Sequence, residues 1–444
     1  MRTRVMGMAA VVALVASACG FGSSSAPKAT VVDTTSTTQH TPVTLTFWSA
    51  YTEPELSKYQ QAFQGFHAKY PWITVKGTGN IEDDKILAAI NSGTPPDAVL
   101  SFSPNNTGKF CSSGAWLSLN DYIAKDHVDL GVFPKVALDY SGYKGNQCAL
   151  PALADAYGLY YNKAMFAKAG IAAPPTTLSE LFADAKKLTV RNADGTIKVA
   201  GFVPWNTYYE MLADPLRLAY DAPWFDASGN PLMGTDPRWA AFLRYQKQFV
   251  DWYGVKNLQR FVAGKGDEFS AQNDFEKGRV AMLYDGEWRD AFIKDEAPAL
   301  QYGAAPFPAA DDAPQQFGAG TIAGDIVGIP RGSKHPAEAW LLIKYLTTDT
   351  AALVGLSNRL KNLPTTTASV NSPDIEPDPN FAPFLKIFAN PRSSFNPLTP
   401  IGQQYGDTFS AFFSKWQAGK VPDLQKGLQG VAKQIQTELD QAGS

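Results

Sequence analysis

The chain has 444 residues, of which 45% are hydrophobic, 12% aromatic and 18% charged. This is more than one hydrophobic core usually needs, so the length predicts two domains, and the aromatic content argues against disorder. Lys and Arg number 39 against 42 Asp and Glu, a formal net charge of −3. Without a basic excess, the composition does not favour a nucleic-acid partner held through its phosphates. No apolar run reaches the roughly 18 residues that a membrane-spanning helix needs.

The first eighteen residues have the pattern of an export signal. Arg2 and Arg4 precede an apolar run over 5–18, which is too short to span a bilayer. The run ends in small residues before Cys19 and resembles a bacterial lipobox, although Ala16 stands where Leu is usual. We therefore expect residues 1–18 to be removed and Cys19 to carry lipid. The alternative is an ordinary signal peptide cleaved near residue 18.

Residues 19–42 form a second, separate segment. They are rich in Ser, Thr, Gly and Ala and hold few apolar side chains. Such a stretch cannot bury a core and is typical of a flexible tether. Anchor, tether and globular body together predict a protein held at the cell membrane and facing the extracytoplasmic side.

Cys111 and Cys148 are the two remaining cysteines. Two thiols in an exported chain predict one disulfide, because the compartment is oxidising. Two buried free thiols are the alternative.

Strands alternate with helices along the first part of the chain. Hydrophobic periodicity predicts strands over 43–48, 73–75 and 97–100, and helices over 54–66 and 83–91. This order predicts βαβ units and a parallel sheet, in which ligands meet the loops beyond the carboxyl ends of the strands. The first such loops begin at Trp48 to Tyr51 and near Asn105.

The rest of the chain continues the mixture of helices and strands. We expect strands over 157–161, 279–284 and 326–329, a hairpin turn at 192–195, and helices over 163–169, 178–188, 239–252, 274–278, 336–346 and within 406–439.

Three segments carry recognisable motifs. They are Leu150-Pro151 with Tyr160-Tyr161-Asn162-Lys163, Phe275-Glu-Lys-Gly278 with Gly286-Glu-Trp288, and Ile329-Pro-Arg-Gly-Ser-Lys334 with Trp340. In this order, behind a lipobox, they resemble the family 1 extracellular solute-binding proteins of bacterial ABC importers, the group that contains the maltose-binding proteins. The resemblance runs from about Val43 to the C-terminus.

The resemblance implies an α/β fold of the type II periplasmic-binding-protein kind. Two hinge-joined lobes, each a mostly parallel sheet flanked by helices, would be connected near Asp155, Phe317 and Leu363. The first lobe would comprise 43–154 with 318–362, and the second 155–317 with 363–444. It further implies a monomer that captures a solute between its lobes and delivers it to the membrane subunits of an ABC permease, while a separate ATPase drives release.

A carbohydrate is the expected ligand. Its capture needs aromatic rings for the C–H faces and polar side chains for the hydroxyl groups. The chain has 10 Trp, 18 Tyr and 26 Phe. The candidate ligand-binding residues are Trp48, Tyr51, Asn105, Asp155, Tyr157, Trp205, Asn206, Tyr208, Asp285, Trp288 and Arg392. The resemblance supports Asp155 and Trp288 most directly. Core packing for Trp48, turn capping for Asp155 and a surface role for Arg392 are the alternatives.

No catalytic, metal or cofactor pattern stands out. The four His residues are isolated, and the chain lacks the HExxH, CxxC, G-x-S-x-G and P-loop patterns. We therefore expect a binding protein with no catalytic residues, cofactor or metal. One alternative is the same scaffold binding a glycerophosphodiester, for which Arg392 is the candidate cation. The other is an exported glycosidase with two catalytic carboxylates.

Overall fold

The computed structural model describes residues 40–204, 208 and 217–443. The predicted signal peptide, Cys19, most of the tether, Trp205 and Asn206 lie outside the described residues. Within the described ranges, no helix is long and apolar enough to span a bilayer.

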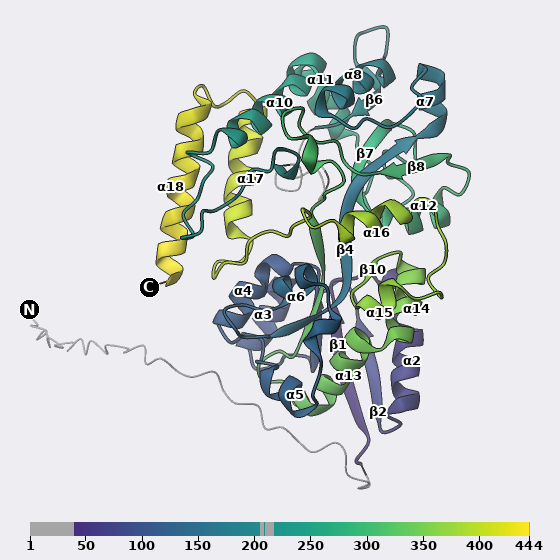
Figure 1. The fold of residues 1–444 in the computed structure, drawn as a ribbon, viewed down its shortest axis with the longest axis vertical. Helices are drawn as coiled ribbons and strands as arrows, with labels where there is room; N and C mark the ends of the chain where they lie inside the picture. Colours follow the sequence, from purple (N-terminus) through teal and green to yellow (C-terminus); the bar gives the residue numbers. More distant parts are fainter. Residues whose placement is uncertain (1–39, 205–207, 209–216, 444) are drawn as a thin grey trace, which may run out of the picture.

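One continuous sheet runs through both lobes of the molecule (Figure 1). Its strand order is β2-β1-β3-β9-β4-β7-β6-β5, and β8 and β10 also pair with β4. The strands are β1 (Val43–Ser49), β2 (Ile73–Thr78), β3 (Ala98–Ser101), β4 (Ala149–Asn162), β5 (Val190–Arg191), β6 (Ile197–Phe202), β7 (Val280–Gly286), β8 (Tyr302–Ala305), β9 (Ile322–Gly328) and β10 (Leu363–Pro364).

The long strand β4 connects the lobes. Its first half pairs with β9 as far as Ala156 opposite Ile322, and its second half pairs with β7 from Tyr157 opposite Gly286. Strand β10 lies beside the same stretch, with Leu363 opposite Ala154. Three chain segments therefore run side by side at the junction between the two halves of the sheet.

The prediction of a mostly parallel sheet was wrong for the central strands. β1 pairs in parallel with β2 and β3, and β6 with β7. By contrast, β9 pairs antiparallel with β3 and β4, and β4 pairs antiparallel with β7. A strand that returns from the other lobe enters the sheet from the opposite end, which reverses its direction. The α/β class and the two-lobed architecture are confirmed.

The first lobe, in the lower half of Figure 1, surrounds β1, β2 and β3 with helices. These are α1 (Glu53–Ser57), α2 (Gln60–Lys69), α3 (Asp83–Asn91), η1 (Pro104–Asn106), α4 (Thr107–Ser112), α5 (Asn120–Lys125), η2 (Leu130–Val132), α6 (Lys135–Ser141), α13 (Pro336–Thr348), α14 (Thr350–Leu360) and α15 (Thr367–Val370). The single helix predicted over 54–66 is two helices, because the N–H groups of Lys58 and Tyr59 bond three residues back and tighten the chain there. This turn places Tyr59 in the core.

Helix α15 also departs from the predicted lobe boundaries, which assigned all of 363–444 to the second lobe. It lies against α14 of the first lobe (Figure 1). The Thr367 hydroxyl donates to the carbonyl of Val132 at 3.2 Å, and Lys361 pairs with Glu376 at 3.3 Å. The chain after β10 therefore covers the first lobe before it continues to the second.

The second lobe, in the upper half of Figure 1, packs helices around β4, β6 and β7. These are α7 (Lys163–Ala169), α8 (Leu178–Leu188), η4 (Leu218–Tyr220), α10 (Pro237–Tyr253), α11 (Val255–Ala263), α12 (Arg289–Glu296), η5 (Pro314–Gln316), α16 (Ala382–Ala389), α17 (Gln404–Gln417) and α18 (Leu424–Gly443). The helix predicted over 274–278 is a turn instead. The Asp274 carboxylate accepts bonds from the Gly266 N–H and from Arg279, and Gly278 has a φ of +67°, so the chain bends into β7.

Cys111 and Cys148 form the predicted disulfide. The bridge ties α4 to the residue before β4, and Cys148 is completely buried. It therefore fixes the first-lobe end of the strand that connects the lobes.

We expect the double variant Cys111→Ser/Cys148→Ser to be less stable by about 3–4 kcal/mol, because its unfolded chain loses a cross-link. Chemical denaturation under oxidising conditions measures this difference. Reduction of the wild-type protein is the control and should give the same loss. Equal stability of the reduced and oxidised wild type would contradict the prediction.

Candidate functional site

Three buried carboxylates meet where the lobes join, and we call Asp155, Glu287 and Asp325 the hinge cluster. Their exposed fractions are 7%, 0% and 1%. Asp155 lies in β4 opposite Ala323 of β9, and Asp325 follows two residues later, so both carboxylates project from the same face of the sheet. Glu287 directly follows β7. The strand pairing itself therefore brings the three groups together.

The hydrogen bonds to the hinge cluster come from neutral donors. The side-chain amide of Asn362 donates to Asp155 Oδ1 at 2.6 Å and to Glu287 Oε1 at 3.2 Å. The backbone N–H of Ala156 donates to Glu287 Oε2 at 2.8 Å. The Tyr51 hydroxyl donates to Asp325 Oδ2 at 2.6 Å.

The pKa values of the three hinge-cluster carboxyl groups are raised because these groups are buried without a cationic partner in the described part of the chain. Burial raises the pKa of Asp155 to about 6. Burial, and next the negative charge of Asp155, raise the pKa values of Glu287 and Asp325 well above their ordinary range. Carboxyl groups without a cationic partner in a dry site retain protons near neutral pH, and they can then donate hydrogen bonds as well as accept them.

An aromatic pair lies beside the hinge cluster. The rings of Tyr157 and Trp288 meet edge to face, with centroids 5.4 Å apart. The Trp288 ring lies over Gly286, where any side chain would collide with it. Trp288 remains partly exposed, and its buried indole N–H has no hydrogen-bond partner. Tyr157 is 3% exposed, so Trp288 supplies the accessible ring surface of the pair next to the carboxyl groups, and aromatic and carboxyl groups are the types that contact a sugar.

Three other predicted residues are engaged in internal contacts. Asp285 forms a buried ion pair with Arg289 at 2.6 Å. Tyr51 is 2% exposed, and its ring packs against Phe102 and Tyr59. The Tyr208 hydroxyl accepts the Asp274 N–H at 3.2 Å, inside the second lobe. Tyr51 reaches the hinge cluster through Asp325, whereas Asp285 and Tyr208 stabilise their own surroundings.

The structure does not gather the remaining predicted residues at the hinge cluster. Trp48, at the end of β1, is half-buried and packs on the core. Asn105 is half-exposed in η1, and Arg392 is exposed, with its N–H bonded to the side chain of Asn390. A ligand role for these residues stays a prediction, as it does for Trp205 and Asn206.

The lobes also touch each other away from the junction. The Gln403 N–H of the second lobe donates to Asn106 Oδ1 of the first lobe at 3.2 Å. Lys58 and Asp295 form an ion pair at 3.5 Å between the lobes. These contacts indicate that the structure shows the lobes in a closed arrangement.

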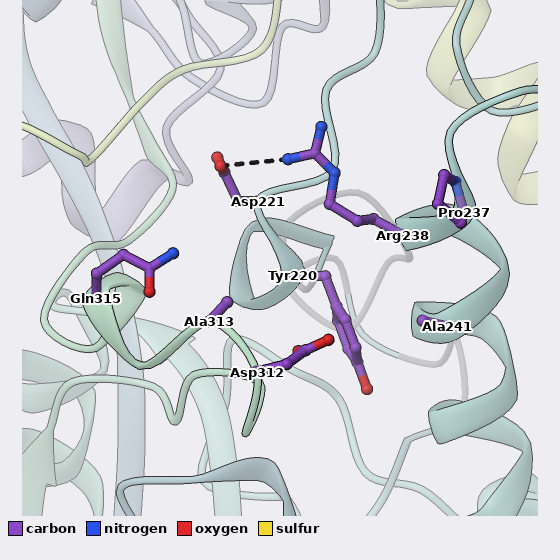
Figure 2. Close-up of a pocket in the computed structure, with 8 residues that line it drawn as sticks. All are labelled: Tyr220, Asp221, Pro237, Arg238, Ala241, Asp312, Ala313 and Gln315. Atoms are coloured by element: carbon purple, nitrogen blue, oxygen red, sulfur yellow. Dashed lines mark hydrogen bonds and ion pairs between the residues drawn. The ribbon is translucent and has the colours of Figure 1, made fainter.

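A separate surface pocket of about 260 Å³ lies in the second lobe (Figure 2). Its lining includes the Tyr220 ring, Asp312 and Gln315. Arg238 at its rim is held by Asp221 at 3.3 Å and by Asp236 at 2.6 Å. Since all of its lining residues belong to one lobe, occupation of this pocket cannot by itself draw the lobes together, and the junction is the stronger candidate site.

Glu287, Asp325 and Asn362 were not among the predicted site residues. Asp325 had a visible signal, because it is the one charged residue in the otherwise apolar stretch 322–329. Glu287 stood beside the predicted Trp288. Asn362 had no sequence signal, because its partner Asp155 is 207 positions away.

The model of the bacterial extracellular solute-binding protein family matches residues 49–353. The chain belongs to this family. Its family relatives include a maltotriose-binding protein of Pyrococcus abyssi, 23% identical over 75% of this chain and 68% of the relative. Among solved structures, CpMnBP1 with mannotriose bound has a TM-score of 0.79 and 26% identity, covering 88% of this chain and 99% of that one. A Listeria monocytogenes substrate-binding protein in complex with cycloalternan shares the fold, with a TM-score of 0.75, 20% identity, and 90% and 99% coverage.

The variant Asn362→Leu should lower the free energy of unfolding at neutral pH by about 2–3 kcal/mol, because two buried carboxyl groups lose their shared donor. Chemical denaturation gives the value. Asn358→Leu is the matched control. Its side chain donates to the Asp374 carbonyl and accepts the Glu376 N–H, but these exposed groups can bond to water instead, so the change should cost about 1 kcal/mol or less. A loss no larger than that of the control would show that the amide does not stabilise the cluster.

Proposed function

We propose that this protein is the substrate-binding lipoprotein of an ABC importer and captures an oligosaccharide between its lobes. The observation that carries the proposal is the aromatic pair Tyr157 and Trp288 beside the hinge cluster, at the junction of both lobes. A ligand held there contacts both lobes and stabilises the closed state. The closed form is then the one that docks on the membrane permease.

The charge of the junction supports a neutral polyhydroxylated ligand over a glycerophosphodiester. A phosphate needs cationic or N–H donors, and every carboxyl of the cluster that ionises would repel it. In the part of the chain that the structure describes, no Lys, Arg or His forms an ion pair with the hinge cluster, and Arg392 is exposed elsewhere. Hydroxyl groups, by contrast, can both donate to and accept from carboxyl groups.

The arrangement of the carboxyls also argues against the glycosidase alternative. Retaining and inverting glycosidases place their two carboxyl groups about 5–10 Å apart, with the scissile bond between them. Asp155 and Glu287 instead share the amide of Asn362, and their exposed fractions are 7% and 0%, which does not fit a scissile bond placed between them. We propose a binding protein without catalytic activity. Relatives described with maltotriose, mannotriose and cycloalternan support an oligosaccharide as the ligand class.

The lobe boundaries and the attachment to the membrane are also part of the proposed function. We propose that the lobes divide near Asp155, Phe317 and Leu363, with α15 assigned to the first lobe. The exchange of partners along β4 at 156–157 supports the first of these positions. We also propose that Cys19 carries a lipid anchor and that residues 19–42 tether the lobes to the outer face of the membrane.

A thermal-shift panel of oligosaccharides, amino sugars, glycerophosphodiesters and peptides tests the ligand class. A ligand that binds only the folded protein adds about 2.7 kcal/mol of stability at one hundred times its Kd. We expect shifts with oligosaccharides, and Trp288→Ala should then weaken binding by about 1–3 kcal/mol.

Trp252→Ala is the matched control, because Trp252 is a half-buried tryptophan of the same lobe that packs on Arg191 and Tyr253. It should leave the affinity unchanged. Thermal shifts with glycerophosphodiesters alone would contradict the assignment of a sugar ligand. Equal ligand affinity of Trp288→Ala and the wild type would show that Trp288 is not part of the site.

The anchor is tested by Cys19→Ser in the full chain expressed in bacteria. We expect the wild type to partition with the membrane fraction and the variant to be released, because one acylated cysteine supplies the membrane affinity. Detergent phase separation followed by blotting measures both. If both forms are released alike, residues 1–18 are an ordinary signal peptide.

A further inference from the structure

Asp155 and Glu287 are neighbours inside the hinge cluster, because one amide, that of Asn362, donates to both carboxyl groups, at 2.6 Å and 3.2 Å. Both carboxyl groups are buried. The other printed donor to Glu287 is the backbone N–H of Ala156, which like the amide supplies no countercharge. Two ionised carboxylates this close in a dry site would repel each other, so the pair favours holding a proton.

The groups of the hinge cluster come from parts of the molecule that separate when the lobes open. Glu287 belongs to the second lobe, directly after β7, while Tyr51 and Tyr140 belong to the first. Asp155 and Asp325 lie on the connecting strands. Opening the hinge therefore moves Tyr51 and Tyr140 relative to Glu287 and admits water to the carboxyl groups.

The Tyr140 hydroxyl is a second, independent sign of an unsatisfied site. Tyr140 is completely buried, and its hydroxyl has no hydrogen-bond partner. The oxygen would lie 2.8 Å from a Cβ on Gly324, the residue between Ala323 and Asp325. The unpaired hydroxyl thus lies against the strand that carries Asp325, where it is a donor for an ionised oxygen of the cluster.

The surroundings provide no cation to compensate the cluster. The titratable groups that face it are Glu55 from α1, Tyr51 after β1, Tyr59 before α2, Tyr140 from α6 and Tyr160 from β4. All of them are acidic or neutral. The described residues also contain no cluster of His, Cys, Asp or Glu with the arrangement of a metal site.

We propose that the proton is a second ligand of this protein: closure of the lobes takes up a proton on the Asp155–Glu287 pair, and loss of that proton favours opening. The closure step rests on the proposed function, whereas the proton held by the pair does not. Solute capture is thereby linked to pH, with firm retention in acidic surroundings and easier release as the pH rises.

The direction of the pH dependence follows from the thermodynamic linkage between proton binding and lobe closure. The pKa of a carboxyl is about 4 when it is open to water. Burial raises the pKa of Asp155 to about 6 and raises that of Glu287 well above its ordinary range. The contribution to closure is complete below the open-state pKa and is lost as the pH rises toward the closed-state pKa. Within this window, ligand affinity should fall up to about tenfold per pH unit for each proton released.

The test uses Glu287→Gln, whose amide is neutral like a protonated carboxyl but cannot ionise. Small-angle X-ray scattering of the ligand-free protein at about pH 5 and about pH 8 measures lobe opening. We expect the wild type to expand at the higher pH and the variant to stay compact at both. Glu296→Gln, a carboxyl of the same lobe on α12, is the control and should behave as wild type.

Infrared difference spectroscopy supplies a readout that needs no lobe motion and no sugar. At neutral pH, the difference spectrum between the wild type and Glu287→Gln should contain the C=O stretch of a protonated carboxyl that belongs to the pair, while the band of the protonated Asp325 cancels. Absence of this band, equal dimensions of the wild type at both pH values, or a pH response retained in Glu287→Gln would each overturn the proposal. If no sugar in the thermal-shift panel stabilised the protein, the proposed function would be refuted. The infrared band of the protonated carboxyl would not be affected by that result.

Discussion

The exchange of strand partners along β4 is the constraint on which the rest of the structure depends. One strand serves both halves of the sheet, pairing with β9 up to Ala156 and with β7 from Tyr157. Because the ladder is continuous, the lobes can move relative to each other only by bending at this point and at the adjacent β9 and β10. Side chains placed there experience any hinge motion directly, whereas those in either lobe core move as a rigid unit.

The end of β7 and the turn that follows it carry three residues with different roles. Asp285 neutralises the buried Arg289, whose side chain also pairs with Glu276 at 3.2 Å. Glu287 points into the junction, where its partners are Asn362 and the Ala156 N–H. Trp288 lies against Tyr157. A buried ion pair is sustained by mutual attraction and its hydrogen bonds, but a buried carboxyl with neutral partners is stable only when it is protonated. Asp285 is therefore favoured as a negative carboxylate and Glu287 as a neutral carboxyl, although both are buried.

Much of the local structure could be predicted because its causes are local. The strand at 43–48, the helices at 83–91, 163–169 and 178–188, and the start of α8 at Thr177 depend on periodicity and capping within a few residues. The Thr177 side chain and Glu180 form a capping box that a reader of the sequence can see.

The site was predictable only in part, because its residues lie far apart in the sequence and meet only in the fold. Asp155 and Trp288 were found through the family resemblance. Asp325 and Asn362 act on residues 274 and 207 positions away, and only the strand pairing brings them together. The antiparallel direction of β9 has the same origin, since it depends on where the chain returns from and not on the pattern of the strand itself.

The polar contacts between the lobes away from the hinge are individually weak. Lys58 is partly exposed and Asp295 largely exposed, with side-chain exposures of 28% and 68%, and such a pair contributes about 0–1 kcal/mol. The hydrogen bond from Gln403 to Asn106 adds about 1 kcal/mol. Apolar contact adds to them, because the rings of Tyr140 and Phe395 meet between the lobes with centroids 6.2 Å apart. A ligand that contacts both lobes adds its differential affinity to these terms and shifts the population toward the closed form. Since one pKa unit corresponds to about 1.4 kcal/mol, one proton on a buried carboxyl pair is comparable in free energy to a polar contact of this kind.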